Sequence, residues 1–153
     1  MKIVINNCFG GFGLSASGVK RYAELIGKKA YFFDNDFGKK YKPITLEEAD
    51  NKILGYSSFT VPNPEKYLKC GDWFTMSDKE RVDYNKRYEE ISLYSSDIKR
   101  DDPKLIQVVE ELGEKANGPC AELSIVEIPD GVKWEIDEYD GNETIHEVHR
   151  SWR

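Results

Sequence analysis

The sequence predicts an α+β fold in a single domain, residues 1–153, with a mixed β-sheet, a C-terminal β-hairpin and two main covering helices. Three observations predict it. A short apolar run at residues 2–6 leads into a glycine-rich loop, and residues 104–116 carry an apolar stripe at helical spacing between Asp102-Pro103 and Gly118. Asp140-Gly141 then separates two alternating segments, which is the signal for a hairpin with a two-residue type I′ turn.

The N-terminal third reads as strand, loop, helix and strand. Residues 2–6 are β-branched enough for a buried strand, and the glycines that follow free the backbone of the loop. Ser15 is expected to cap a helix at residues 16–26 that stops at Gly27, with a second strand at residues 30–33. A right-handed parallel crossover is the default connection between the two strands, and an antiparallel or non-neighbouring arrangement is the alternative.

The middle of the chain, residues 34–99, reads as an irregular, aromatic-rich layer that resembles an insertion. Capping boxes that begin at Thr45 and Ser77 predict helices to about residues 52 and 91, and residues 56–61 predict a strand. Aromatic residues at this density indicate a core with an amphipathic rim, or alternatively a stacking surface or a subunit interface.

Strands at residues 121–128, 133–139 and 143–149 are expected to join the same sheet. A two-residue turn places Ile136 opposite Ile145 and Glu135 opposite His146, so one hairpin face is apolar and the other polar. The polar face groups Glu135, Asp137, Tyr139, Thr144 and His146. Such a group can act as an acid or base, or it can be an ordinary solvated surface.

Composition excludes several functional classes. The net charge of −6 and the pI near 5.1 disfavour binding to duplex nucleic acid, which needs clustered cations. Three cysteines without a C-x-x-C pair, and two histidines, predict neither a disulfide framework nor a metal site, and no cofactor is expected. The absence of a long apolar run or a signal peptide predicts a cytoplasmic protein that does not bind a membrane. The many aromatics predict a homodimer or larger assembly.

A glycine-rich loop that opens a helix is typical of an anion site, because amide groups and the positive helix end face one concavity. The loop matches neither G-x-G-x-x-G nor the P-loop ending G-K-[ST]. It therefore either binds a phosphate-bearing small molecule or lets Phe9 and Phe12 tuck beneath the sheet. The expected ligand-binding residues are Asn6, Phe9, Gly10, Gly11, Phe12, Gly13, Ser15, Arg21, Arg100, Arg150 and Trp152.

Within this set, arginines would pair with phosphate and an aromatic ring would stack on a base. Arg150 and Trp152 are expected to close over the loop. In the alternative, Trp152 plugs the end of the sheet and Arg150 bonds to a carboxylate such as Glu138.

Both ends of the chain carry a resemblance. The opening KIVINNCFGGFGLS, and the closing motifs RDDP, EIDEYDG and HRSW, resemble a family of small accessory proteins of tailed bacteriophages and prophages. The likeness spans residues 1–33 and 100–153. It implies a protein that acts inside the host by binding, and several phage families look like sponges for nucleotide-derived immune signals.

The expected function is therefore non-enzymatic sequestration of such a signal. Two alternatives stay open. The first is an interaction protein that inhibits a host protein through its acidic hairpin. The second is a small hydrolase or transferase that uses the glycine-rich loop with Cys8 as the thiol.

Overall fold

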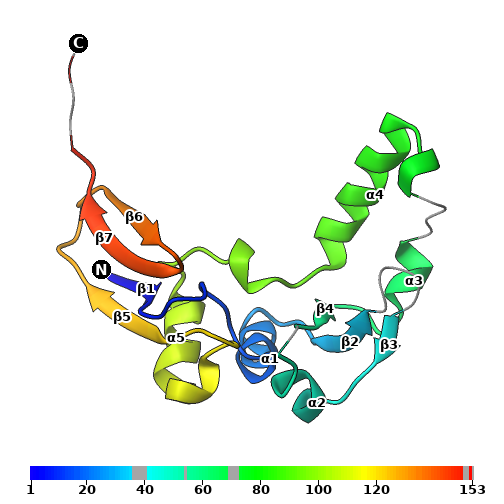
Figure 1. Ribbon diagram of the computed structural model, residues 1–153, viewed down its shortest axis with the longest axis horizontal. Coiled ribbons are helices and arrows are strands. Elements are labelled where there is room, and N and C mark those ends of the chain that lie inside the picture. The colour runs from blue at the N-terminus through cyan, green and yellow to red at the C-terminus, as the bar shows by residue number, and fades with distance from the viewer. Residues whose placement is uncertain (36–40, 54, 69–72, 150–151, 153) are drawn as a thin grey trace. The chain divides into compact units, whose positions relative to one another are not determined.

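The computed structural model describes residues 1–35, 41–53, 55–68, 73–149 and 152 of this chain. It confirms the predicted α+β class and the C-terminal hairpin (Figure 1). The chain divides into two compact units. Unit 1 comprises Met1–Tyr22 and Ser95–Arg153, and unit 2 comprises Ala23–Tyr94. None of the described helices is long and apolar enough to cross a membrane.

The elements of the described residues follow in chain order. They are β1 (Lys2–Asn6), α1 (Ala16–Leu25), β2 (Tyr31–Asn35), β3 (Tyr41–Pro43), α2 (Leu46–Asp50), β4 (Ser57–Phe59), α3 (Pro64–Tyr67), η1 (Trp73–Thr75), α4 (Asp78–Ile91), η2 (Ser95–Asp97), α5 (Pro103–Leu112), η3 (Gly113–Ala116), β5 (Leu123–Glu127), β6 (Trp134–Tyr139) and β7 (Asn142–Glu147).

In unit 1, β1 and β5 form an antiparallel pair in which Lys2 lies opposite Glu127 and Asn6 opposite Leu123. Helix α5 packs against both strands. Ile3 and Val4 of β1 are fully buried, as is Leu105 of α5, so this contact is the core of the unit.

Helix α5 begins as predicted and ends earlier. The Asp102 carboxylate accepts a hydrogen bond from the Lys104 amide at 2.8 Å, and Pro103 stands in the first turn. The backbone of Gly113 has a φ of +56°, which ends the α-helix. The last turn of the predicted helix, residues 113–116, is the 3₁₀ helix η3.

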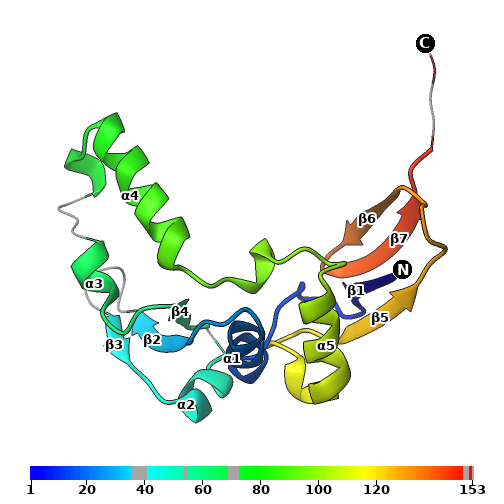
Figure 2. The ribbon, with the colours of Figure 1, turned by 180° about the vertical axis from the view of Figure 1, so that it is seen from behind.

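The hairpin register is confirmed. Glu135 lies opposite His146, and Ile136 opposite Ile145. The turn residues Asp140 and Gly141 have φ angles of +49° and +89°, and a type I′ turn needs positive φ at both. Strand β7 lies beside β1 in both views (Figures 1 and 2), yet the hairpin is a sheet of its own.

The prediction of one mixed sheet is wrong. The described strands form three small antiparallel sheets, β1-β5, β3-β2-β4 and β6-β7. The default parallel crossover is not formed, because β2 pairs with β3 and β4. The alternative, in which the two strands are not neighbours, is the one observed. The edge of β1 that faces away from β5 is already bonded: the Val4 amide donates to the Arg100 carbonyl at 2.9 Å, and the Asn6 amide to the Glu143 carboxylate at 2.9 Å.

Unit 2 is built on aromatic packing. Its buried cluster is Phe33, Phe59, Leu68 and Ile91, with half-buried tyrosines against it. Phe59 meets Phe33, Tyr41 and Tyr88 edge to face. The interpretation as a core with an amphipathic rim is therefore confirmed for Phe59 and the tyrosines packed against it, whereas Phe74 is 85% exposed.

Some elements of unit 2 were predicted from the sequence and others were not. Thr45 and Ser77 cap α2 and α4 as predicted, and β4 lies within the predicted strand. Strand β3 and helix α3 were not predicted. Pro64 is the first residue of α3, a position where proline is favoured.

Candidate functional site

The glycine-rich loop, residues 8–14, is held between two other turns of unit 1. The Gly10 amide donates to the Asp140 carbonyl at 3.1 Å, and the Gly118 amide donates to the Gly13 carbonyl at 2.9 Å. A Cβ atom on Gly141 would lie 2.2 Å from the Gly11 nitrogen, so the hairpin turn approaches the loop too closely for any side chain. Close contact thus explains Gly10, Gly118 and Gly141 without a ligand, whereas a Cβ on Gly11 or Gly13 would meet nothing within 4 Å.

The N-terminus of α1 abuts the end of η3. Ser15 caps α1 as predicted, because its Oγ accepts from the Gly18 amide at 3.0 Å. The Ser15 hydroxyl donates to the Lys115 carbonyl at 2.5 Å, and its amide donates to the Ala116 carbonyl at 2.9 Å. The positive end of one helix thus meets carbonyl oxygens of another, where an anion was expected.

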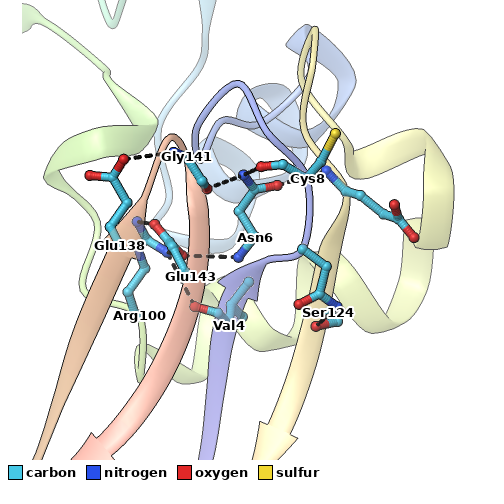
Figure 3. Close-up of polar contacts among 10 residues, drawn as sticks. Val4, Asn6, Cys8, Arg100, Ser124, Glu138, Gly141 and Glu143 are labelled. Carbon is cyan, nitrogen blue, oxygen red and sulfur yellow. Dashed lines mark hydrogen bonds and ion pairs between the residues drawn. The ribbon is translucent and has the colours of Figure 1, made fainter.

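Arg100 and Glu143 form an ion pair in which the carboxylate is buried and the guanidinium is partly buried (Figure 3). The guanidinium donates from Nη1 to Oε2 at 2.6 Å and from Nη2 to Oε1 at 2.8 Å, a bidentate geometry. Its Nη1 also donates to the Val4 carbonyl at 3.3 Å, and its central carbon lies 3.4 Å from the centroid of the Phe12 ring. The cation is fully engaged by its own chain.

Asn6 ties the same network to the loop. Its Nδ2 donates to the Cys8 carbonyl at 2.8 Å and to the Gly141 carbonyl at 2.6 Å, and its Oδ1 accepts from the Glu122 amide at 2.8 Å (Figure 3). Among the described residues, no buried side-chain nitrogen or oxygen lacks a hydrogen-bond partner. Asn6 and Arg100 therefore hold the fold together, and phosphate binding by them stays a prediction.

The other predicted ligand residues lie apart. Arg21 forks onto Glu111 of α5, with Nε to Oε2 at 2.7 Å and Nη2 to Oε1 at 3.2 Å. Hydrogen bonds from Arg21, and then from Gln107, lower the pKa of Glu111 to about 2. Trp152 is 87% exposed, so it does not plug the sheet, and Arg150 lies outside the described residues.

The loop and the hairpin together line an open hollow of about 360 Å³. It is lined by Phe9, Asp137, Glu138, Tyr139, Asn142 and Thr144, which we call the hairpin–loop surface. Phe9 is 61% exposed and Tyr139 is 81% exposed. The prediction that Phe9 tucks beneath the sheet is wrong, because the hairpin turn occupies the space next to the loop and leaves the ring outside.

The predicted polar face of the hairpin is present as a group. His146 Nε2 lies 3.1 Å from Thr144 Oγ1 and 3.7 Å from Asp137 Oδ2. Asp137 and Glu138 line the hollow, and no lysine or arginine is among its described lining residues. The Glu138 carboxylate accepts a hydrogen bond from the Gly141 amide at 2.7 Å. A field of this sign attracts positive groups and repels phosphate.

The described residues give little support to thiol catalysis at Cys8 or to metal binding. The Cys8 thiol hydrogen-bonds to the Phe9 carbonyl at 3.5 Å rather than to a base. Within the described part of the chain, no group of three or more His, Cys, Asp or Glu side chains is placed to hold a metal ion.

The sequence analysis missed two features. One is the Arg100–Glu143 pair, although Glu143 falls on the hairpin face of Ile145, and a charge on an apolar face signals a buried partner. The other is the meeting of Phe9 with the hairpin, for which no local pattern exists. Comparison with known proteins adds nothing here, because no family model, curated protein or solved structure matches the chain.

Proposed function

We propose that this chain is a non-enzymatic binding protein whose hairpin–loop surface contacts a basic partner protein. One observation carries the proposal: two exposed aromatic residues, Phe9 and Tyr139, line the same hollow as the acidic residues Asp137 and Glu138. Taken with the resemblance to phage accessory proteins, the proposed partner is a host protein with an arginine- or lysine-bearing surface.

The chemistry of the surface suits a cationic side chain. Both the faces of aromatic rings and carboxylate oxygens attract cations, and the flat guanidinium of arginine can stack on the first while it hydrogen-bonds to the second. Tyrosine is also a frequent anchor of protein interfaces, because burying its ring removes a large apolar area from water. Tyr139 is mostly exposed and thus has this area to bury.

The same geometry disfavours the alternatives. A phosphate-bearing ligand would meet a hollow lined by two acidic residues and no described cation, and Arg100 already has a carboxylate partner. The loop amides of Gly10 and Ser15 donate to carbonyl groups of the chain. These contacts support the interaction hypothesis over the phosphate and hydrolase hypotheses.

The proposal is tested with Phe9→Ser and Tyr139→Ser variants in affinity capture from bacterial lysate with quantitative mass spectrometry. Phe74→Ser is the matched control, because Phe74 is 85% exposed and lies in unit 2. Calorimetry with the purified captured protein then gives Kd. We expect each hairpin–loop variant to weaken binding tenfold or more, which is about 1.4 kcal/mol, and Phe74→Ser to bind as the wild type does.

Salt supplies an independent check. Binding to a basic partner should weaken as ionic strength rises, because the hollow is open to solvent and its carboxylates are screened. Capture that survives both serine substitutions would refute the proposal. A nucleotide released from denatured, purified protein would instead favour the phosphate-binding hypothesis.

A further inference from the structure

We propose that the outer edge of β5 is a second docking site, where an extended segment of a partner protein with alternating basic and apolar residues adds a strand to the β1-β5 sheet. The segment would pair with the free main-chain groups of β5 and place side chains in an adjoining hollow. The inference is independent of the proposed function, because it uses other residues than the hairpin–loop surface.

The register of the sheet shows that this edge is open. The Asn7 amide donates to the Glu122 carbonyl, and the Ile128 amide to the Met1 carbonyl, each at 2.8 Å. Bonded pairs alternate along an antiparallel ladder, so the main-chain groups of Ile125 and Glu127 point away from β1. Among the described residues, none hydrogen-bonds to these outward groups.

The opposite edge of the sheet is closed by specific contacts. The Val4 amide and carbonyl bond to the Arg100 carbonyl and guanidinium, and the Asn6 amide bonds to the buried Glu143 carboxylate. Proteins usually protect the edge strands of their sheets, because free main-chain groups at an edge can pair with another chain. Here one edge is blocked. On the other edge the Leu123 amide donates to Asn117 Oδ1 at 3.0 Å, and the main-chain groups of Ile125 and Glu127 are left available.

A hollow of about 500 Å³ lies along the open strand. It is lined by Val109, Gly113, Glu114, Asn117, Glu122, Leu123, Ser124 and Ile125. Figure 1 shows β5 as the outer strand of its pair with α5 beside it. Peptides that add a strand gain affinity from main-chain bonds and specificity from pockets for alternate side chains, and this edge offers both.

Charge identifies the occupant. Glu114 and Glu122 line the hollow, and its described lining residues include no lysine or arginine. Glu127 ends the strand, opposite Lys2 of β1. A second copy of β5 would bring its own Glu122 and Glu127 to this acidic edge. Charge complementarity therefore favours a lysine- or arginine-bearing segment over self-association.

The test uses the full chain and a synthetic Lys-Val-Lys-Val-Lys-Val-Lys peptide as the probe. Two control peptides have glutamate in place of lysine, or N-methyl groups on alternate amides. With the lysine peptide we expect slower hydrogen exchange of the Ile125 and Glu127 amides, and little change at Ser124, whose amide already faces β1. The glutamate peptide should bind at least tenfold more weakly, and the N-methylated peptide should give no protection.

Two variants sharpen the result. Ile125→Pro removes an outward N–H, a change that edge strands tolerate, and should abolish binding of the peptide. Tyr139→Ser should leave binding of the peptide unchanged, so this proposal can fail separately from the proposed function. The N-methylated peptide tests main-chain pairing with the wild-type chain. The hypothesis can therefore be tested even if the Ile125→Pro variant does not fold.

Three outcomes would overturn the inference. They are equal binding of the lysine and glutamate peptides, protection by the N-methylated peptide, and Ile125 and Glu127 amides that are already protected in a dimer without peptide. The last outcome would assign the edge to a second copy of the chain.

Discussion

Glu143 is a carboxylate on the hairpin face that also carries Ile145, and only 6% of it is exposed. Replacing it with alanine leaves the Arg100 guanidinium largely buried without a counter-ion and removes the acceptor of the Asn6 amide. We expect Glu143→Ala to lower the free energy of unfolding by about 3–5 kcal/mol, measured by urea denaturation.

Glu147→Ala is the matched control, because Glu147 is an exposed residue of the same strand. It should change the free energy of unfolding by less than about 0.5 kcal/mol. If Glu143→Ala had the same free energy of unfolding as this control, the unpaired Arg100 guanidinium would have to be hydrated by solvent in the variant.

A comparison of Gly141 with Gly131 separates the free-energy cost of a side chain at positive φ from the cost of a steric clash with the loop. Both have positive φ, +89° and +81°, but a Cβ on Gly141 would meet the loop backbone whereas one on Gly131 would meet nothing within 4 Å. We expect Gly131→Ala to cost about 1–2 kcal/mol for its backbone conformation alone. Gly141→Ala should cost more, and thermal or urea unfolding measures the difference. If the two variants lost the same free energy of unfolding, the loop backbone would move to accommodate the Cβ atom at no measurable cost.

Residue-level signals were predictable where they are local. Ser15 and Asp102 each bond to an amide within three residues, so their capping roles could be found in the sequence. Glu143 and Arg100 are 43 residues apart, and their pairing depends on how β7 comes to lie beside β1. No spacing rule encodes that approach.

At the scale of elements, the ion pair of Arg21 with Glu111 joins α1 to α5. It lowers the pKa of Glu111 from 4.5 to about 2, so its stabilisation is present above pH 4.5 and is lost as pH falls through about 2. We expect Arg21→Gln to raise this pKa toward 4.5, as followed by ¹³C NMR titration of the glutamate carboxyl groups.

Lys104→Gln is the matched control, because it removes one charge from an exposed position of α5 itself. It should leave the Glu111 titration near its wild-type position. If Glu111 of the wild-type protein titrated near 4.5, the two hydrogen bonds from Arg21 to Glu111 would not persist in solution.

Elements with caps or turn signals were predictable, and short elements without them were not. The hairpin could be placed to the residue because its Asp-Gly turn fixes the register. Strand β3 has three residues and no alternation long enough to detect, so it was interpreted as part of an irregular layer. Its place is set by pairing with β2.

At the scale of the whole molecule, the sequence predicted the class but not the division of strands among sheets. Apolar strands of similar composition give no sign of which will pair. Here β1 uses its second edge for Arg100 and Glu143 instead of a third strand, and β2 builds a separate sheet in unit 2. The expected homodimer stays a prediction.

The candidate site was predictable only in pieces. The polar face of the hairpin followed from its register, and Phe9 belonged to the expected ligand residues. Their union in one acidic hollow arises because Gly141 lets the turn lie directly against the loop. The function that we propose for this hollow therefore involves a cationic group, whereas the sequence favoured an anion held by loop amides.

The order in which the ribosome makes this chain bears on how it folds. Unit 2 is one continuous stretch, whereas unit 1 joins Met1–Tyr22 to Ser95–Arg153. Val4 must wait for Arg100, 96 residues later, which is about 5–20 s at typical rates of synthesis. During that interval β1 is an apolar strand with both edges bare, so unit 2 can fold while the first-made segment is still exposed to chaperones and to aggregation.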